Sequence, residues 1–211
     1  MPAPGATWVV IPTYNEADTL ADLVMAVRAE LPSDHRILVV DDASPDGTGE
    51  IADDLGVDVL HRSEKRGLGP AYVAGFRRAL DGGAEAIVQM DADFSHEPQY
   101  LPALLGALGE ADLAIGSRYV PGGRIHDWGA GRRAISSLGS RYARMALGVG
   151  VRDLTGGFKA WRRAALDRIA IEEVSATGYA FQVETTYRAI KAGFRVTEVP
   201  VAFHDRRVGA S

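Results

Sequence analysis

The chain has 211 residues and a net charge of −5, with 46% hydrophobic and 24% charged residues, which is ordinary for one globular domain with a sizeable core. It contains no cysteine and no apolar run approaching ~18 residues, which excludes a disulfide framework, a thiolate metal site and a membrane span within this sequence. The charge is uneven, because residues 1–115 hold 7 Lys/Arg against 20 Asp/Glu, whereas residues 116–168 hold 11 against 3.

Apolar runs and helical patterns alternate along the first half of the chain. Five short apolar runs predict buried strands at residues 8–11, 37–40, 57–60, 86–90 and 113–115. Helical patterns lie at residues 17–30, after the turn at residues 44–47, and at residues 67–80. Strands joined by helices of this length predict an α/β fold with βαβ units and a mainly parallel sheet.

Beyond residue 118 the pattern loosens into loops, a basic helix over residues 133–147, a helix over residues 179–191 and an alternating strand over residues 194–203. The basic helix carries an apolar stripe formed by Ile135, Leu138, Tyr142 and Met145. Two interpretations of the stripe stay open. It packs on the sheet as a core face, or it lies on anionic lipid with Arg141 and Arg144 at the level of the headgroups.

Polar residues follow four of the predicted strands at the point where each strand ends. These stretches are residues 13–16, 41–42, 91–93 and 116–118. Right-handed crossovers place the C-terminal ends of the strands along one edge of the sheet, and such sheets bind ligands at that edge. Four separate stretches are therefore predicted to converge on one crevice.

Two carboxylates, Asp91 and Asp93, stand one residue apart just past a predicted strand. An Asp-x-Asp arrangement offers hard oxygen ligands to Mg²⁺ or Mn²⁺, and such a cation neutralises charge on a diphosphate leaving group. The alternative is a strand-end turn in which the two side chains cap backbone N–H groups. No glycine-rich phosphate loop follows the first strand, which argues against a P-loop NTPase or a dinucleotide oxidoreductase and leaves the diphosphate to a metal.

Four motifs resemble those of family 2 glycosyltransferases with a GT-A fold, namely VIPTYNE at residues 10–16, VDDASPDGT at 40–48, DADFSH at 91–96 and GSR at 116–118. Three later blocks are similar to the polyprenol (dolichyl) phosphate mannose synthase subfamily, namely DLTGGFK at 153–159, GYAFQVE at 178–184 and VPVAFHDR at 199–206. The resemblance covers nearly the whole chain. It implies one catalytic domain over residues 1–211, a Rossmann-like three-layer sandwich with a nucleotide-sugar-binding half (1–115) and an acceptor-binding half (116–211).

The resemblance implies a metal-dependent enzyme that moves mannose from GDP-mannose to a polyprenyl (dolichyl-type) phosphate with inversion, as in lipid-linked protein glycosylation. The residues that it assigns to the nucleotide are Pro12, Tyr14, Glu16, Val40 and Asp42. It assigns Asp91, Ala92 and Asp93 to the diphosphate and the metal, with Asp93 catalytic. Ser95 stands where some relatives have a glutamine that contacts the metal.

The basic segment suits this chemistry, because a polyprenyl phosphate is already an anionic nucleophile and needs positioning and charge compensation rather than a strong base. Arginine grips phosphate with a two-pronged fork. The acceptor-phosphate candidates are Arg118, Arg132, Arg133 and Arg206. Arg118 is also predicted to be catalytic, because it directly follows a strand at the active edge. The alternative for each is a solvated surface arginine.

Two other functions stay open, which are transfer of glucose or another sugar from a UDP-sugar to a lipid phosphate or a saccharide hydroxyl, and nucleotide-sugar binding without catalysis. A lipid acceptor implies a membrane surface as partner, and no nucleic acid is expected. The N-terminal residues lack a signal-peptide pattern, so we expect a cytoplasmic protein, peripheral at the cytoplasmic face of the membrane. The resembling family usually continues past the position of Ser211, so we expect an anchoring partner or a further C-terminal segment.

Overall fold

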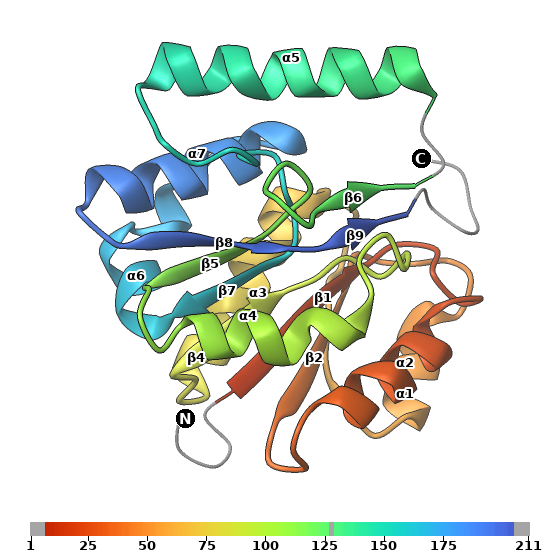
Figure 1. Ribbon diagram of the computed structural model, residues 1–211. Helices are drawn as coiled ribbons and strands as arrows, with labels where there is room; N and C mark the ends of the chain where they lie inside the picture. Colours follow the sequence, from red (N-terminus) through yellow and green to blue (C-terminus); the bar gives the residue numbers. More distant parts are fainter. Residues whose placement is uncertain (1–6, 127–128, 205–211) are drawn as a thin grey trace.

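The computed structural model describes residues 7–126 and 129–204, apart from the side chains of residues 130 and 132–137. Its centre is a seven-stranded sheet in the order β3-β2-β1-β4-β7-β5-β8 (Figure 1). The strands are β1 (Thr7–Thr13), β2 (Arg36–Asp41), β3 (Asp58–His61), β4 (Ala86–Gln89), β5 (Leu113–Ser117), β7 (Lys159–Arg162) and β8 (Val196–Pro200). Every neighbouring pair is parallel except the two pairs that β7 makes, with β4 and with β5.

Helices cover both faces of this sheet. One face packs against α1 (Leu20–Glu30), α2 (Thr48–Asp54) and α4 (Leu101–Ala107), and the other against α3 (Leu68–Asp81), α6 (Arg163–Arg168) and α7 (Tyr179–Lys191). Alternation along β1 supplies both layers, because Val9 and Ile11 join the core on the α1 side while Trp8 and Val10 join the core on the α3 side. The predicted three-layer α/β sandwich with a mainly parallel sheet is confirmed.

Small elements complete the chain. Two 3₁₀ turns, η1 (Pro98–Tyr100) and η2 (Ile171–Glu173), precede α4 and α7, and β6 (Arg124–Ile125) pairs with β9 (Ala202–Phe203) in a two-stranded sheet. The predicted strand over residues 194–203 is therefore two strands, β8 and β9, which lie in different sheets and flank the buried Val201.

Close packing between α3 and the sheet depends on a glycine. A Cβ at Gly75 would lie 2.4 Å from Val10 Cγ1 and 2.9 Å from Val40 Cγ2, distances that only a side-chain-free residue permits. Helix α1 packs on the opposite face of the sheet through an apolar stripe. Its members, which are all fully buried at helical spacing, are Leu20, Leu23, Val24 and Val27.

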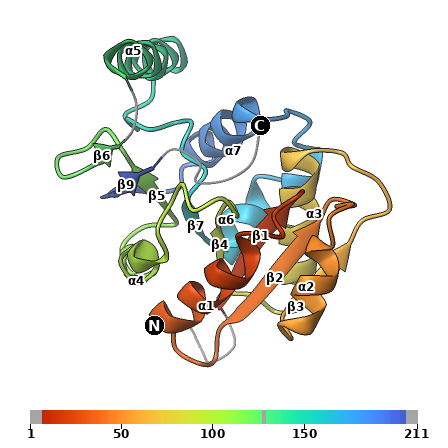
Figure 2. The same ribbon diagram turned by 90° about the vertical axis from the view of Figure 1, so that its right-hand side faces the viewer.

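Helix α5 (Ala130–Leu147) stands apart from the three layers, across the end of the molecule opposite α1 and α2 (Figures 1 and 2). Its body-facing side is formed by Ser140, which is buried, and by Ala143 and Leu147, which pack against the core. Among the described residues, no helix combines the length and apolar character that a bilayer span requires.

The interpretation of the α5 stripe as a core face is wrong for its described members. Leu138, Tyr142 and Met145 are 65%, 71% and 69% exposed, on the side of the helix that points away from the protein. Ile135 lies among the side chains that the structure does not describe. The helix touches the body through small residues and Leu147 instead, so its largest apolar side chains are left in solvent.

Candidate functional site

The polar stretches that follow the strands meet at one edge of the sheet, as predicted. Parallel pairing aligns Thr13 at the end of β1 with Asp41 at the end of β2, and places Gln89 at the end of β4 beside Val10. Strand β7 runs the other way, so its first residue, Lys159, lies opposite Gln89 at the same edge. An antiparallel strand therefore adds a charged residue that the search for strand ends did not find.

The two aspartates after β2 are held by the protein's own donors. Asp42 is 3% exposed, and its carboxylate accepts hydrogen bonds from the Arg62 guanidinium and from the backbone N–H groups of Arg66 (3.0 Å) and Gly67 (2.7 Å). These bonds close the segment after β3 onto the end of β2. The Asp42 carboxylate thus accepts hydrogen bonds from three residues of the protein, and its assignment to the base or ribose of a nucleotide stays a prediction.

The other residues assigned to the nucleotide differ in accessibility. The Tyr14 ring is partly exposed and carries the Lys65 ammonium 3.5 Å from its centroid. Glu16 is buried, and its carboxylate accepts a hydrogen bond from the Thr19 hydroxyl at 3.1 Å. The Val40 side chain is fully buried in the core beneath α3, which leaves only its backbone for a ligand. Pro12 is buried within β1.

The Asp91–Asp93 pair emerges from β4 into the same crevice. The Tyr72 hydroxyl donates a hydrogen bond of 2.6 Å to Asp91 Oδ1. Burial, and then the charge of Asp91, raise the pKa of Tyr72 well above its ordinary value, so this hydroxyl stays a donor. The backbone N–H of Ser95 donates to Asp93 Oδ1 at 2.9 Å, so the turn-capping role also exists, and the second oxygen of Asp93 can serve a different partner.

These residues fit a divalent cation that a substrate helps to bind. Within the described ranges no group of three or more His, Cys, Asp or Glu side chains is arranged to hold a metal ion. Mg²⁺ is commonly bound through one or two carboxylates together with the phosphates of a substrate, and Asp91 and Asp93 supply that number. Ala92 between them is 3% exposed and contributes only its backbone.

A loop from residue 153 to residue 158 closes over Asp91. A Cβ at Gly157 would lie 2.9 Å from Asp91 Oδ2, so glycine is what lets the loop backbone come this close. The loop is fixed at its other end by Asp153, a fully buried residue whose backbone N–H donates to Glu198 Oε1 at 2.9 Å. Sequence reasoning attached no role to either residue.

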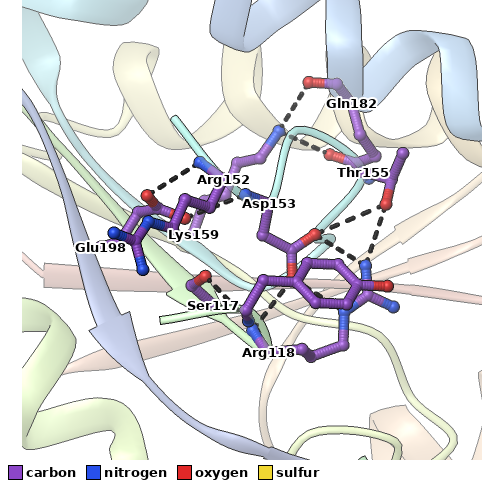
Figure 3. Close-up of polar contacts among 9 residues, drawn as sticks. Ser117, Arg118, Arg152, Asp153, Thr155, Lys159, Gln182 and Glu198 are labelled. Carbon is purple, nitrogen blue, oxygen red and sulfur yellow. Dashed lines mark hydrogen bonds and ion pairs between the residues drawn. The ribbon is translucent and has the colours of Figure 1, made fainter. Parts of the chain in front are cut away.

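Arg118 is bound to that loop (Figure 3). Its guanidinium grips Asp153 with two hydrogen bonds, Nε to Oδ2 at 2.8 Å and Nη2 to Oδ1 at 2.7 Å, and Nη2 also donates to the Thr155 hydroxyl at 2.9 Å. Burial works to lower the pKa of Arg118, but the hydrogen bond and charge of Asp153 outweigh it and hold the pKa above its ordinary value. In the described structure this fork holds the buried carboxylate of Asp153, and the assignment of Arg118 to the acceptor phosphate stays a prediction. Arg118 acts as a positioning residue for the loop over Asp91.

A second buried network lies beneath the carboxylates. Lys159 is fully buried, and its ammonium donates to both the backbone and side-chain oxygens of Gln182, each at 2.9 Å. The same side-chain oxygen of Gln182, seen beside Lys159 in Figure 3, also accepts a hydrogen bond from Gln89 at 2.7 Å. The network therefore joins β4, β7 and α7. Burial lowers the pKa of Lys159 to about 7, although Asp153 and Asp91 act in the opposite direction.

Known proteins are similar to this chain in sequence and in fold. Residues 8–170 match the family described as glycosyl transferase family 2. The chain belongs to this family. It is 49% identical to the polyprenol monophosphomannose synthase of Mycolicibacterium smegmatis, over 97% of this chain and 80% of the relative, and 47% identical to the undecaprenyl-phosphate mannosyltransferase of Micrococcus luteus, over 96% and 85%.

Among solved structures, glucosyl-3-phosphoglycerate synthase from Mycobacterium tuberculosis superimposes with a TM-score of 0.74 at 20% identity, over 97% of this chain and 73% of that one. That protein has also been solved with Mn²⁺, UDP-glucose and phosphoglyceric acid, a structure that superimposes with a TM-score of 0.71. At this identity the likeness concerns the fold, and it confirms the predicted GT-A architecture. The chain is an enzyme, a glycosyltransferase.

The remaining arginine predictions of this glycosyltransferase fall outside the described side chains. Arg132 and Arg133 lie in the first turn of α5, where the structure describes the backbone alone, and Arg206 lies beyond residue 204. Their assignment to an acceptor phosphate stays a prediction. Ser95 is 6% exposed, and its short side chain leaves Asp91 and Asp93 as the metal-binding candidates.

Proposed function

We propose that this glycosyltransferase moves mannose from GDP-mannose to a polyprenyl phosphate, with inversion at the anomeric carbon and with help from Mg²⁺ or Mn²⁺. The observation that carries the proposal is the identity of nearly half of all positions with two relatives named for mannosyl transfer to, or the mannosyl form of, polyprenyl phosphates. The match extends through the later blocks of the chain, where an acceptor-binding half is expected.

The chemistry asks little proton transfer of the protein. An oxygen of the acceptor phosphate forms a bond to the anomeric carbon while the bond from that carbon to the GDP diphosphate breaks, so the electron pair leaves with GDP. The nucleophile is already anionic, because a phosphate monoester loses its second proton near pH 6. A bound divalent cation supplies charge neutralisation for the departing diphosphate. Asp91 and Asp93 would hold that cation.

The chain's own residues then serve mainly to position these groups. Tyr72 orients Asp91, and the Arg118–Asp153 pair holds the loop whose Gly157 approaches the same carboxylate. The reaction is proposed to take place at the cytoplasmic face of a membrane, because a polyprenyl acceptor resides in the bilayer.

The test is a transfer assay with labelled GDP-mannose and labelled UDP-glucose, each offered with a short-chain polyprenyl phosphate, with and without Mn²⁺. We expect a mannosylated lipid from GDP-mannose only when the metal is present, and none from Asp93→Asn. Product from UDP-glucose alone would overturn the donor, and full activity in EDTA would overturn the role of the metal.

A further inference from the structure

The side-chain amide of Gln182 is held in one orientation by donors on one side of it. Its Oε1 accepts hydrogen bonds from the Lys159 ammonium at 2.9 Å (Figure 3) and from the amide nitrogen of Gln89 at 2.7 Å. The amide of Gln89 is itself oriented, because the Trp161 indole N–H, which is a donor only, donates to Gln89 Oε1 at 3.4 Å. A reversed Gln182 amide would face these donors with its own N–H groups. Its oxygen therefore points into the core, and its nitrogen, Nε2, points the other way.

The Nε2 atom of Gln182 borders the crevice at Asp91. A Cβ at Gly157 would lie 3.5 Å from Gln182 Nε2 and 2.9 Å from Asp91 Oδ2, so the amide and the carboxylate flank the same point. Gln182 is 2% exposed, and within the described part of the chain its Nε2 donates to no other residue. The atom is not fully enclosed by protein, so it can reach a ligand in the crevice. A buried side chain thus turns an unused donor toward the candidate metal site.

The charge behind this amide favours an anionic partner for Nε2. Lys159 is fully buried and forms no ion pair with any residue that the structure describes. Burial lowers its pKa to about 7, so the charges of Asp153 and Asp91 compensate the ammonium only in part. Hydrogen bonds in a chain polarise one another, and an amide whose oxygen is held by an ammonium is a stronger donor at its nitrogen. Such a donor bonds most strongly to an anionic oxygen.

The proposed reaction brings two anions into the crevice, and they have different needs. The diphosphate of the sugar donor is neutralised by the cation that Asp91 and Asp93 would hold. The attacking phosphate needs charge compensation and alignment rather than a base. A glutamine amide supplies both and cannot remove a proton, because its nitrogen is not basic. The acceptor phosphate is therefore the anion that Gln182 suits.

We propose that Nε2 of Gln182 donates a hydrogen bond to an anionic oxygen of the acceptor phosphate, and that Lys159 and Gln89 are positioning residues that keep the amide turned toward it. The inference rests on the proposed function, from which it takes its ligand. Gln182 then also selects the class of acceptor. It stabilises a phosphate that arrives already ionised, and it offers no base to a hydroxyl group, whose proton would have to be removed during attack.

Gln182→Glu is the sharpest test, because it exchanges one nitrogen for an oxygen. The carboxylate still offers an oxygen to Lys159 and Gln89, so the fold is expected to remain, but its second oxygen meets the acceptor phosphate with a negative charge and no proton to donate. The affinity for a short, water-soluble polyprenyl phosphate, measured by calorimetry with GDP and Mn²⁺ present, should fall about 10- to 100-fold, as expected when a hydrogen bond to a charged group is lost. The acceptor KM should rise by the same factor, while the KM for GDP-mannose stays close to that of the wild type.

Two further variants and one further ligand separate the hydrogen bond from other effects. Gln182→Met keeps the side-chain volume without adding charge, and it should weaken acceptor binding less than Gln182→Glu does. Gln99→Glu, which changes an exposed glutamine on η1, is the matched control and should bind the acceptor like the wild type. The prenol of the same length, which lacks the phosphate, should bind equally to the wild type and to Gln182→Glu. Thermal unfolding checks that each variant is folded.

Wild-type acceptor affinity in both Gln182 variants would overturn the proposal. An equal rise in the KM for GDP-mannose would place the amide on the donor and overturn it as well, and so would an equal weakening of prenol binding. The proposed function fails separately. Polyprenyl phosphate binding that depends on Gln182, in a wild type that transfers no mannose, would overturn that function and leave the phosphate contact standing.

Discussion

The side chain of Asp91 is positioned by Tyr72, a residue to which the sequence analysis assigned no role. The Tyr72 hydroxyl donates to Asp91 Oδ1 from the middle of α3, and Tyr72 itself is fully buried and stacked on Phe76 and Phe181. Groups that orient a metal ligand contribute strongly to metal affinity although they never touch the ion. Tyr72 is such a group for the proposed cation.

Tyr72→Phe should therefore weaken Mn²⁺ binding about tenfold while the protein stays folded, because the ring packing is kept and only the hydroxyl is lost. Calorimetric titration of Mn²⁺ in the presence of GDP measures the affinity. Tyr100→Phe, a partly buried tyrosine on η1, is the matched control and should leave the affinity unchanged. Equal Mn²⁺ affinity in Tyr72→Phe and wild type would contradict the role of the hydroxyl.

Lys159 makes stability depend on pH. Its pKa is lowered from 10.5 to about 7 in the folded protein, so between these values the unfolded chain binds more protons than the folded one. The free energy of unfolding contributed by this residue therefore rises with pH above about 7.

Lys159→Met removes this contribution and keeps the side-chain volume. The stability of the wild type relative to the variant should increase by about 2 kcal/mol between pH 7 and pH 9, as measured by urea denaturation. Lys191→Met, which changes an exposed lysine on α7, should keep the pH slope of the wild type. A constant difference between wild type and Lys159→Met across this range would contradict the burial argument.

Among the elements, the loop between α5 and β7 shows how a local segment is fixed by distant ones. Arg118 at the end of β5 holds Asp153, and Glu198 of β8 accepts the backbone N–H groups of Arg152 and Asp153, both at 2.9 Å. Because β5 and β8 of the central sheet both hold Asp153, the loop that begins there is fixed in place and can keep Gly157 close to Asp91. The buried pair thus links the sheet to the candidate metal site.

Asp153→Asn should cost about 3–5 kcal/mol of unfolding free energy, because it leaves the buried Arg118 guanidinium without its compensating charge. Asp58→Asn breaks the Arg36–Asp58 pair, whose side chains are 43% and 27% exposed, and should cost less than about 1 kcal/mol. Chemical denaturation of both variants gives the comparison. Similar losses in the two would mean that the Arg118–Asp153 pair does not stabilise the loop.

In the whole molecule, the acidic and the basic stretches of the sequence belong to different elements of the fold. Residues 1–115, which are acidic overall, form β1 to β4 and contain the two candidate metal ligands. Residues 116–168, which are basic overall, contain α5 and the arginines that line a cavity beside it. We therefore expect the metal-bound sugar donor to lie beside the acidic part of the sheet edge. We expect the phosphate acceptor to lie beside the basic part of the same edge.

Binding of GDP together with Mn²⁺ should increase the thermal stability of the protein. At 100 times its dissociation constant, GDP is expected to stabilise the protein by about 2.7 kcal/mol, which raises the Tm by about 5–10 °C. The rise should require Mn²⁺ and disappear in Asp93→Asn, as measured by thermal shift. An equal rise in EDTA would show that GDP binds without the cation.

Much of the scaffold follows from the sequence alone. The apolar runs of β1, β2, β4 and β5 are local signals of buried strands, and the polar residues that end them had to meet at one edge once the strands were parallel. The aspartates of residues 91–93 were placed correctly for the same reason. Strand β7 escaped prediction because it begins with a lysine, and only Gln182 and Thr185 on α7 make the burial of that lysine tolerable.

Only the tertiary structure decided how the charged groups are used. The position of Arg118 at the active edge was predicted from its place after a strand. Its partner Asp153 lies 35 residues further along the chain, and no local sequence pattern predicts that the two residues pair. The stripe of α5 shows the same limit, since helical periodicity reveals an apolar face but not its direction. Direction depends on which side of the helix the rest of the fold can cover, and here the fold covers Ser140, Ala143 and Leu147 and leaves the stripe outside.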